Sequence, residues 1–532
     1  MKSMMGDSYA HSAGQSMSMN EAPLFIIKKI KENDYKVDLQ SLKIEASKKY
    51  NLNKVIRNSD ILKFTEDPKI IEILRKKPMR TLSGIAVVAV MTRPKKCPHG
   101  RCTYCPKGEN ACQSYTGKEP ASLRAIQNNF DPYKQTLERL KQLKRIGHPI
   151  DKIELIVMGG TFPSECLDYQ EYFVKRCLDA MNSKDSLILE EAQRNNERSK
   201  VRCIGMTFET RPDWCKESHI SRMLDFGVTR VELGVQNIYD FIYKRVERGH
   251  TVKDVIESTQ LLKDSGLKIN YHLMPGLPGS NIERDIRAFK NIFKDERFKP
   301  DMVKFYPCLV IKGTKLYEEW KKGEFTPYKT EDALKVILEV KKAMPKWVRT
   351  MRIQRDIPTQ YIDAGVKRAD LGSLIYKELK KQGIKCKCIR CREAGLKYYK
   401  EGIIPEKIEL LVEEYKASKG KEYFISFEDV EKDILIGFLR LRIPYKPFRK
   451  EINEETSLIR ELHVYGQMLP IGDRNKRWWQ HKNFGTKLLE KAEEIGREEG
   501  MKRILVTSGI GVREYYRKFN YKKIGAYMGK EL

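Results

Sequence analysis

The stretch of sequence that decides the fold is short and rich in cysteine: Cys97-Pro98-His99-Gly100-Arg101-Cys102-Thr103-Tyr104-Cys105. Three thiolates this close together can bind one metal centre, and a 4Fe–4S cluster held by three cysteines leaves its fourth iron open to a reacting ligand. A structural zinc site is the alternative, but it needs a fourth protein ligand, for which His99 and Cys112 are the nearby candidates. We therefore predict a 4Fe–4S cluster bound by Cys97, Cys102 and Cys105.

This stretch follows the first of six β-branched runs that alternate with amphipathic helical patterns. The alternation predicts a parallel sheet whose ligands bind at the carboxyl ends of the strands. Six β/α units are too few for a closed eight-stranded barrel, so we expect a partial (β/α)6 barrel over residues 81–345. The expected strands are 85–92, 153–158, 202–208, 230–235, 268–274 and 302–307.

The second to fifth predicted strands also end in loops with suitable chemistry. Gly159 and Gly160, followed by Thr161, let the backbone approach a ligand closely. Glu209 and Arg211 end the third strand and offer polar contacts to a nucleoside. Each loop alone could be an ordinary turn, but four in phase predict a ligand site, which also includes Gln236 at the end of the fourth strand.

The charge of the chain predicts a polyanionic partner. It carries 102 Lys and Arg against 72 Asp and Glu, a formal net charge of +30. Each neutralised phosphate releases counterions, so RNA is the natural partner. A heat-adapted surface would raise the number of both signs together. We expect residues 24–80 to form a small basic helical module that binds tRNA, after a disordered tail at 1–23.

Cysteine usage points to a reducing compartment. Six of the 12 cysteines fall in two tight clusters, which is typical of metal-binding thiols in a cytoplasmic protein. The chain has no run of 18 apolar residues, so we expect no membrane span. The sequence is compatible with a monomer or a homodimer and requires no accessory protein.

The second cluster lies in a basic segment, 346–404, that we predict to be a linker, with an RNA-facing surface as its functional interpretation. Cys386, Cys388 and Cys391 fall within six residues and would bind zinc tetrahedrally with one more ligand. Cys308, at the end of the sixth predicted strand, is our candidate for that fourth ligand. Free surface thiols are the alternative.

The last segment, 405–532, has another pattern, with expected strands at 422–429, 433–443, 458–465 and 503–507 and helices at 485–499 and 511–519. A glycine-containing loop at 480–489 runs into the first of these helices. Its unpaired N–H groups and the helix dipole suit a pyrophosphate. The loop resembles the acyl-CoA loop of GNAT acetyltransferases. Asn483 stands where that family usually has Gly, and Asn tolerates positive φ better than most residues.

The first cysteine stretch resembles the motif of radical S-adenosylmethionine (SAM) enzymes, with the aromatic Tyr104 before the last cysteine. Four residues rather than the usual three separate Cys97 from Cys102. A radical SAM motif followed by a GNAT domain is similar to the family of the Elongator catalytic subunit, in its archaeal or bacterial single-chain form. Further motifs of that family stand at 113–120, 157–162, 209–213, 355–358, 460–466 and 515–518.

The resemblance implies a reaction with two substrates besides SAM. SAM bound at the open iron would yield a 5′-deoxyadenosyl radical, which takes hydrogen from the methyl group of acetyl-CoA. The carbon radical would add to C5 of uridine 34 in the tRNA anticodon, and hydrolysis would leave a carboxymethyl group. By motif, acetyl-CoA contacts are expected at Glu461, Leu462, His463, Val464, Phe484, Gly485, Thr486, Tyr515, Tyr516 and Lys152, the last two with a catalytic role.

Two other functions stay open at this point. A protein lysine acetyltransferase with a structural Fe–S domain would need a general base in the GNAT cleft and a protein substrate that suits a strongly basic chain. A tRNA-binding scaffold with degenerate sites is supported best by Asn483.

Overall fold

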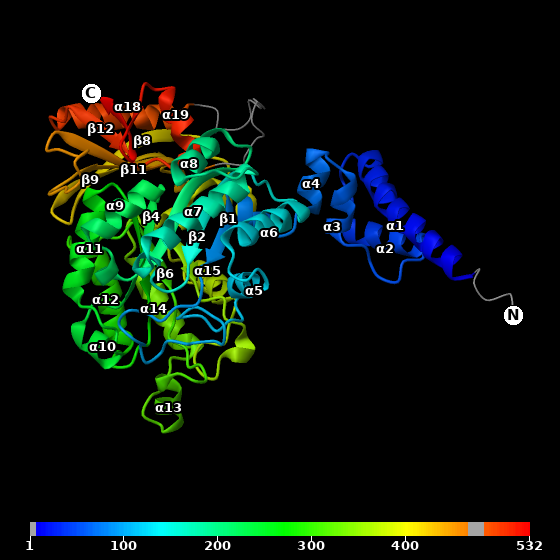
Figure 1. The fold of residues 1–532 in the computed structure, drawn as a ribbon, viewed down its shortest axis with the longest axis horizontal. Helices are drawn as coiled ribbons and strands as arrows, with labels where there is room; N and C mark the ends of the chain where they lie inside the picture. Colours follow the sequence, from blue (N-terminus) through cyan, green and yellow to red (C-terminus); the bar gives the residue numbers. More distant parts are fainter. Residues whose placement is uncertain (1–6, 466–482) are drawn as a thin grey trace. The chain divides into compact units, whose positions relative to one another are not determined.

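The computed structural model describes residues 7–465 and 483–532, which belong to two compact units. The first unit comprises residues 1–86 and 138–150, and the second comprises residues 87–137 and 151–532. Figure 1 traces the chain from its N-terminus in blue to its C-terminus in red. No helix in these described ranges is long and apolar enough to cross a membrane.

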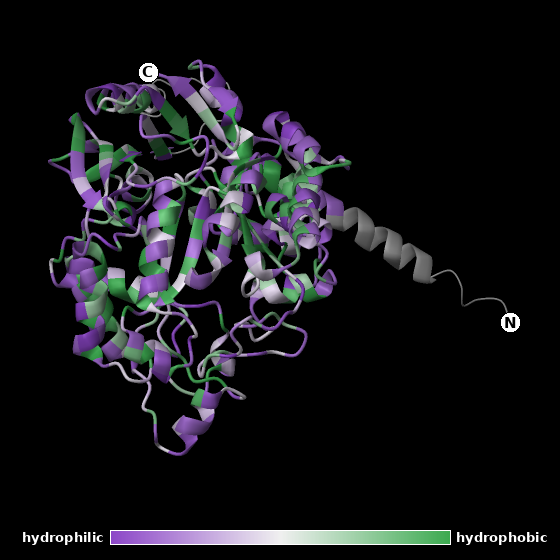
Figure 2. Cartoon of the chain, turned by 60° about the vertical axis from the view of Figure 1, so that its left-hand side comes forward, coloured by the Kyte–Doolittle hydropathy of each residue, from purple (hydrophilic) through white to green (hydrophobic). Residues whose placement is uncertain are grey.

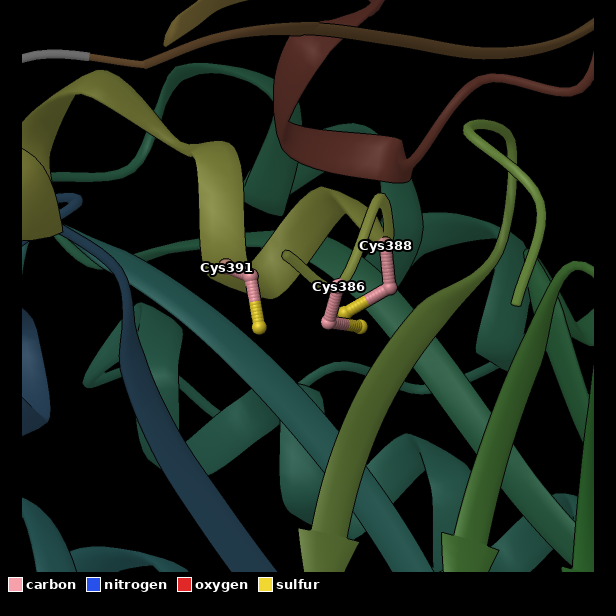
Figure 3. Close-up of side chains that lie close together, drawn as sticks. All are labelled: Cys386, Cys388 and Cys391. Atoms are coloured by element: carbon pink, nitrogen blue, oxygen red, sulfur yellow. The ribbon is translucent and has the colours of Figure 1, made fainter. Parts of the chain in front are cut away.

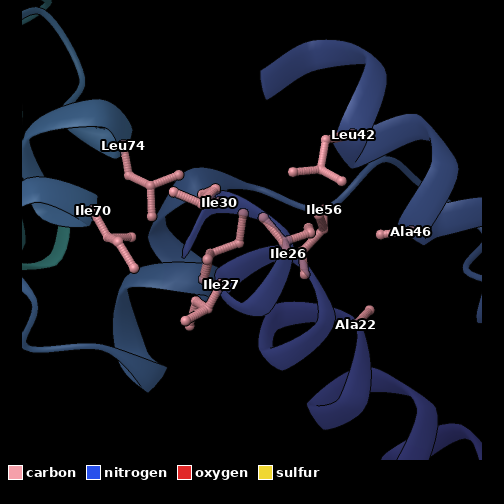
Figure 4. Packing of buried hydrophobic residues seen from close by; sticks show 10 residues of the cluster. Ala22, Ile26, Ile27, Ile30, Leu42, Ala46, Ile56, Ile70 and Leu74 are labelled. Carbon is pink, nitrogen blue, oxygen red and sulfur yellow. The ribbon is translucent and has the colours of Figure 1, made fainter. Parts of the chain in front are cut away.

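The first unit is helical, and its core is aliphatic. Ile26 and Ile27, with Ile30 about one turn later, pack with Leu42 and Leu74 from later helices (Figure 4). The first helix begins inside segment 1–23, which we expected to be disordered; Ala, Met and Gln in that segment favour helix. The elements are α1 (Asp7–Glu32), α2 (Leu39–Lys49), α3 (Asn58–Ile61), η1 (Leu62–Phe64), α4 (Pro68–Leu74) and η2 (Pro78–Thr81).

The second unit contains a curled parallel sheet of seven strands in sequence order. Six of them agree with the predicted strands. The seventh lies in segment 346–404, so the prediction of a linker there is wrong for this part: the strand has five residues, two of them Arg, and no apolar run that would mark it. The strands are β1 (Ala86–Met91), β2 (Lys152–Met158), β3 (Arg202–Thr210), β4 (Arg230–Gln236), β5 (Lys268–Leu273), β6 (Met302–Phe305) and β7 (Arg349–Ile353).

Helices pack against one face of this sheet through aromatic contacts. Phe208 of β3 meets Phe226 at a ring-centroid distance of 6.2 Å, and Phe305 of β6 meets Phe289 at 6.3 Å. Successive side chains of a strand point to opposite faces, so Glu209, next to Phe208, points into the concave side. Hydrophobic residues, green in Figure 2, are frequent along the strands. The helix α6 (Pro132–Arg145) is shared, because its residues from 138 onward belong to the first unit. The other helices of the second unit before the second sheet are α5 (Pro120–Gln127), α7 (Leu167–Asn182), α8 (Leu189–Arg198), α9 (Glu217–Phe226), α10 (Asp240–Arg245), α11 (Val252–Asp264), α12 (Ile282–Lys294), α13 (Lys315–Lys321), α14 (Thr330–Lys342), α15 (Leu371–Lys381), α16 (Ile389–Arg392) and α17 (Ala394–Glu401).

A second sheet, in the order β13-β14-β12-β11-β10-β9-β8, forms the C-terminal part of the same unit. Its strands pair antiparallel except β11 with β12, which are parallel. The four predicted strands are present, whereas β8, β13 and β14 were not predicted; β8 is an edge strand that exposes Glu409, Glu414 and Lys416. The elements are β8 (Ile408–Ala417), β9 (Gly420–Asp429), β10 (Ile434–Ile443), β11 (Thr456–Val464), α18 (Phe484–Glu498), β12 (Arg503–Val506), α19 (Arg513–Arg517), β13 (Lys522–Ile524) and β14 (Tyr527–Glu531).

Buried ion pairs join the two sheets. Arg460 of β11 donates to Asp301 at 2.8 Å and to Glu422 of β9 at 3.0 Å. Glu422 also pairs with Lys263 of α11 at 3.3 Å and with Arg442 of β10 at 3.0 Å. All five side chains are fully buried. The second sheet is therefore fixed to the parallel sheet by buried ion pairs that cross between the two parts.

Candidate active site

The first cysteine stretch forms the loop after β1, at the carboxyl edge of the parallel sheet. The N–H of Thr103 donates to the carbonyl of Val246 at 3.1 Å, and the N–H of Leu316 donates to the carbonyl of Thr103 at 2.9 Å. Cys102 and Cys105 are 3% and 6% exposed, while Cys97 is partly exposed. The loop is thus held at both sides, with two of its three thiols shielded from solvent.

Polar side chains surround the three sulfur atoms. One hydroxyl, one imidazole, one guanidinium and one amide approach them: Thr161 Oγ1 lies 3.4 Å from Cys97 Sγ, His99 Nε2 3.2 Å and Arg248 Nη1 3.6 Å from Cys102 Sγ, and Gln113 Nε2 3.2 Å from Cys105 Sγ. Such N–H and O–H donors suit sulfur atoms that carry negative charge.

The spacing of these thiols fits an iron–sulfur cluster better than one zinc ion. Zn–S bonds of about 2.3 Å in a tetrahedron place sulfur atoms about 3.8 Å apart. Within the described chain, Cys97, Cys102 and Cys105 do not form a group whose ligand atoms all lie within 4.8 Å of one another. Cys112 is also no ligand, because its thiol donates to the carbonyl of Thr92 at 2.8 Å and burial raises its pKa to about 12.

Both positions after β2 favour glycine, Gly159 through close approach and positive φ and Gly160 through positive φ alone. Gly159 has φ +123°, and a Cβ there would lie 2.3 Å from Thr92 Oγ1; Gly160 has φ +77°. Thr161 follows directly and contacts Cys97, as stated above. The structure therefore brings this predicted loop to the cysteine stretch.

The other predicted residues at this edge differ in whether their polar atoms already have hydrogen-bond partners. Gln236 has φ +66°, and its buried Oε1 has no hydrogen-bond partner among the described residues. The hydroxyl of Tyr104 is also buried and has no hydrogen-bond partner among the described residues. Arg211, however, donates twice to Asp213, at 2.9 and 2.8 Å, and once to the carbonyl of Arg248 at 2.7 Å. Three of the five N–H donors of Arg211 are therefore used within the protein, and its contact with a nucleoside stays a prediction.

A charged group inside the concave face was not predicted, apart from Glu209. Glu232 of β4 contacts His272 of β5 at 2.7 Å and pairs with Lys304 of β6, whose Nζ also lies 3.9 Å from Glu209. Glu209 accepts from the hydroxyl of Tyr115 at 3.0 Å. Burial alone would raise the pKa of Glu232, but Lys304 and His272 hold it well below its usual value. Alternation along four neighbouring strands could have revealed this group, since each residue is one of the inward positions.

The second cysteine cluster has the spacing of a single-ion site. The Sγ atoms of Cys386, Cys388 and Cys391 all lie within 4.8 Å of one another and point into one space (Figure 3). Lys341 Nζ lies 3.2 Å from Cys388 Sγ and 3.5 Å from Cys391 Sγ. Cys308 packs instead in the hydrophobic cluster around the first cysteine loop, so the prediction that it is the fourth ligand is wrong.

The predicted acyl-CoA loop begins α18 as expected. Asn483 adopts φ +56°, a left-handed conformation that Asn tolerates better than most residues other than Gly. A Cβ at Gly485 would lie 2.8 Å from the hydroxyl of Tyr515 and 3.9 Å from Val464 Cγ2, so Gly485 is needed for this close packing. Phe484 anchors the helix start on Phe427, with ring centroids 4.7 Å apart. Residues 480–482 of the predicted loop lie outside the described ranges.

The two tyrosines of α19 differ. The hydroxyl of Tyr515 reaches the helix start and hydrogen-bonds Thr486. Tyr516 is 7% exposed and packs against Tyr515 and Tyr521, with centroids 5.3 and 5.8 Å apart. Tyr515 is therefore the better placed of the two for a ligand at α18.

The remaining predicted acetyl-CoA residues lie at the opposite edge of the parallel sheet from the cysteine loop. Glu461 accepts from Arg440 at 2.8 Å, and Leu462 pairs with the neighbouring strand β10. Burial lowers the pKa of His463 to about 4, so its ring is neutral. Lys152 is the first residue of β2 and the cysteine loop follows the strand ends, so a strand length of roughly 20 Å separates them.

Comparisons with known proteins cover most of the chain. Residues 24–82 match the ELP3 N-terminal domain, 91–290 the Radical SAM superfamily, 300–381 the Radical_SAM C-terminal domain and 390–521 the Acetyltransferase (GNAT) family. These matches agree with the partial barrel and the second sheet described above.

Several relatives are similar over nearly their whole length. A protein of Methanocaldococcus infernus named tRNA uridine(34) acetyltransferase is 60% identical over 487 residues, covering 89% of this chain and 91% of that protein. Human Elongator complex protein 3 is 44% identical and covers 93% of each chain. The solved structure of M. infernus Elp3 with an N-terminal deletion is 56% identical, covers 85% of this chain and 100% of that one, and has a TM-score of 0.76. The chain therefore belongs to the Elp3 family of radical SAM and GNAT proteins.

Proposed function

We propose that this protein is an enzyme that carboxymethylates C5 of uridine 34 in tRNA anticodons, using SAM and acetyl-CoA. The observation that carries this proposal is that a cysteine loop suited to a 4Fe–4S cluster and a helix start suited to acyl-CoA belong to one unit joined by buried ion pairs. The name of the 60% identical relative supports the same substrate. A net charge of +30 suits an RNA partner.

At the carboxyl edge, Cys97, Cys102 and Cys105 would hold the cluster. When bound, the cluster and SAM would supply a carbon-centred radical beside two buried thiols and the partly exposed Cys97. Gly160 would leave room for the backbone to approach SAM, because a Cβ there would lie no closer than 3.9 Å to another part of the protein. Gln236, with its buried and unpartnered Oε1, would accept a hydrogen bond from a polar group of SAM.

At the other edge, the second sheet would bind acetyl-CoA. The first N–H groups of α18 suit its pyrophosphate, and Gly485 keeps that helix start open beside Tyr515. Glu461 is already paired with Arg440, so it is not free to act as the general base of a lysine acetyltransferase. Lys152 lies at the same edge of the parallel sheet as the residues to which Arg460 binds, which supports a role in binding acetyl-CoA rather than a role at the cluster.

We further propose that Cys386, Cys388 and Cys391 bind a structural zinc ion. Their mutual spacing matches a single tetrahedral ion, and Lys341 would balance the excess negative charge of three thiolates. Within the described residues, no further His, Cys, Asp or Glu ligand atom joins this group. The basic helical unit and the basic surfaces would bind tRNA in the cytoplasm, with the protein a monomer or homodimer.

The deciding experiment is anaerobic incubation of reconstituted protein with SAM, acetyl-CoA, a one-electron reductant and tRNA, followed by nucleoside mass analysis. We expect carboxymethyluridine with the unaltered protein and none with Cys102→Ala. Cys166→Ala is the matched control, because Cys166 is exposed and outside both clusters. A tRNA with cytidine at position 34 should give no product.

Two outcomes would contradict the proposal. Acetylation of a lysine peptide that persists in Cys102→Ala would point to a protein acetyltransferase. Tight tRNA binding with no consumption of SAM or acetyl-CoA would point to a scaffold.

A further inference from the structure

We infer that Arg248 is the counter-cation of the iron–sulfur cluster and, with Gln113, raises its reduction potential. This inference rests on the proposed function only in that Cys97, Cys102 and Cys105 bind the cluster. Nothing in the sequence singles out Arg248, which follows α10 in a loop between two strands. The geometry alone draws attention to it.

Arg248 is a buried cation that has no carboxylate partner. It is 8% exposed, and among the described residues no Asp or Glu forms an ion pair with it. A buried guanidinium without an anion is costly, so such groups are normally paired. The ionisable group of the cysteine stretch that Arg248 contacts is the thiol of Cys102, whose Sγ lies 3.6 Å from its Nη1. The anion that Arg248 lacks is therefore expected at the three thiols.

The other donors of Arg248 are fixed so that one nitrogen faces the cysteine. Nη2 donates to the carbonyl of Gly234 at 2.5 Å, and Nε donates to Nε2 of His250 at 3.1 Å. Burial lowers the pKa of His250 to about 2, so this ring is a neutral acceptor. A Cβ at Gly234 would lie 2.5 Å from Arg248 Nη2, so glycine at this position of β4 makes room for the guanidinium. Nη1 is left 3.6 Å from Cys102 Sγ.

Gln113 provides a second, neutral donor to another ligand of the same cluster. Its Nε2 lies 3.2 Å from Cys105 Sγ, and its side chain is buried. Hydrogen bonds to cluster sulfur atoms and nearby charge are the means by which proteins set the potential of such clusters. Two donors of different charge on two cysteines allow the charge effect to be separated from the hydrogen-bond effect.

The direction of the effect follows from charge. Three thiolates and a 4Fe–4S core of charge 2+ carry a net charge of −1, which becomes −2 after one electron is added. A fixed cation at Cys102 stabilises the more negative state more strongly in a medium of low dielectric constant. Arg248 therefore favours reduction, and Gln113 acts in the same direction with a smaller effect.

The test uses the full-length protein, reconstituted anaerobically, with reduction potentials measured by EPR-monitored titration. Arg248→Gln should lower the equilibrium constant for reduction at least tenfold, a shift of about 59 mV to more negative potential for a one-electron couple. Arg248→Lys keeps the charge and should recover most of this shift, and Gln113→Leu should give a smaller shift of the same sign. Arg245→Gln is the control: it removes the same charge three residues away, but Glu319 already neutralises Arg245.

Iron and sulfide contents are measured for each variant. If Arg248→Gln binds four irons with an unchanged potential, the inference is wrong. If Arg248→Gln does not assemble a cluster, the potentials of Arg248→Lys and Gln113→Leu test the inference instead. Potentials equal to that of the unaltered protein in both variants would overturn the inference. A shifted potential in a protein that makes no modified uridine supports the inference and contradicts the proposed function. If the unaltered protein binds no iron, both fail.

Discussion

Replacing Arg460 by Met should destabilise the second unit strongly, because it leaves two buried carboxylates underpaired. Arg460 donates to both oxygens of Asp301, at 2.8 and 2.5 Å, and to Glu422 at 3.0 Å. Removing one partner of a buried pair typically costs about 3–5 kcal/mol. We expect the free energy of unfolding to fall by about that amount.

The matched control is Arg297→Met. Arg297 pairs with Asp295 at 2.6 Å, but its side chain is 61% exposed. Exposed pairs contribute about 0–1 kcal/mol, so this variant should unfold close to the unaltered protein. Urea unfolding at pH 7, followed by circular dichroism and by tryptophan fluorescence, measures the difference between the two variants.

The pH dependence gives a second signature of the same cluster. Burial alone would raise the pKa of Asp301, but Arg460, Lys263 and Arg440 hold it well below its usual value. A carboxyl with a lowered pKa in the folded state contributes stability that is present above the pKa of the unfolded chain, about 3.9. This stability is lost as the pH falls further. The gap between Arg460→Met and the unaltered protein should therefore narrow below about pH 4.

The reasoning is refuted if Arg460→Met and Arg297→Met lose the same stability within about 0.5 kcal/mol at pH 7. It is also refuted if the loss in Arg460→Met is independent of pH down to pH 3. Either result would mean that Lys263 and Arg442 alone neutralise Glu422 and Asp301.

Three further changes test other parts of the molecule. Gly485→Ala should weaken CoA binding about tenfold in calorimetry, because the new Cβ meets the Tyr515 hydroxyl, and Tyr515→Ala in the same chain should restore part of the affinity. Cys386→Ser should lower the zinc content measured by mass spectrometry to less than half an ion per chain, whereas Cys308→Ala should leave it unchanged. Glu232→Gln should cost roughly 3 kcal/mol of unfolding free energy, since its lysine partner in the barrel would remain buried without that anion.

The order of strands and helices could be predicted from the sequence because apolar runs and helical periods mark buried elements. The six strands from β1 to β6 each carry a β-branched or apolar run. The strand β7 has Arg at two of five positions, and the edge strand β8 carries exposed Glu, so neither has the pattern of a buried strand. Charged strands are recognised only when the neighbours that pair with them are known.

The candidate site was predictable where one short segment holds the chemistry. Cys97, Cys102 and Cys105 stand in nine residues, and Asn483 stands at a loop position that favours positive φ. Cys308 could not be placed, because two cysteine clusters were equally compatible with a strand end. The role of Arg248 could not be predicted either. It depends on a contact with Cys102, which lies 146 residues earlier in the chain, and the guanidinium reaches this cysteine beside Gly234.

The ion pairs between the two sheets bear on how the enzyme can be dissected. If the chain were cut before β8, the barrel fragment would expose Lys263 and Asp301. The C-terminal fragment would expose Arg442, Arg460 and Glu422. All five side chains are fully buried in the intact chain. In each fragment these groups would lose the partners that lie in the other fragment, and both fragments would be prone to aggregate. Acetyltransferase assays on an isolated C-terminal fragment would then measure a protein that is not natively folded. Such assays therefore need the intact chain.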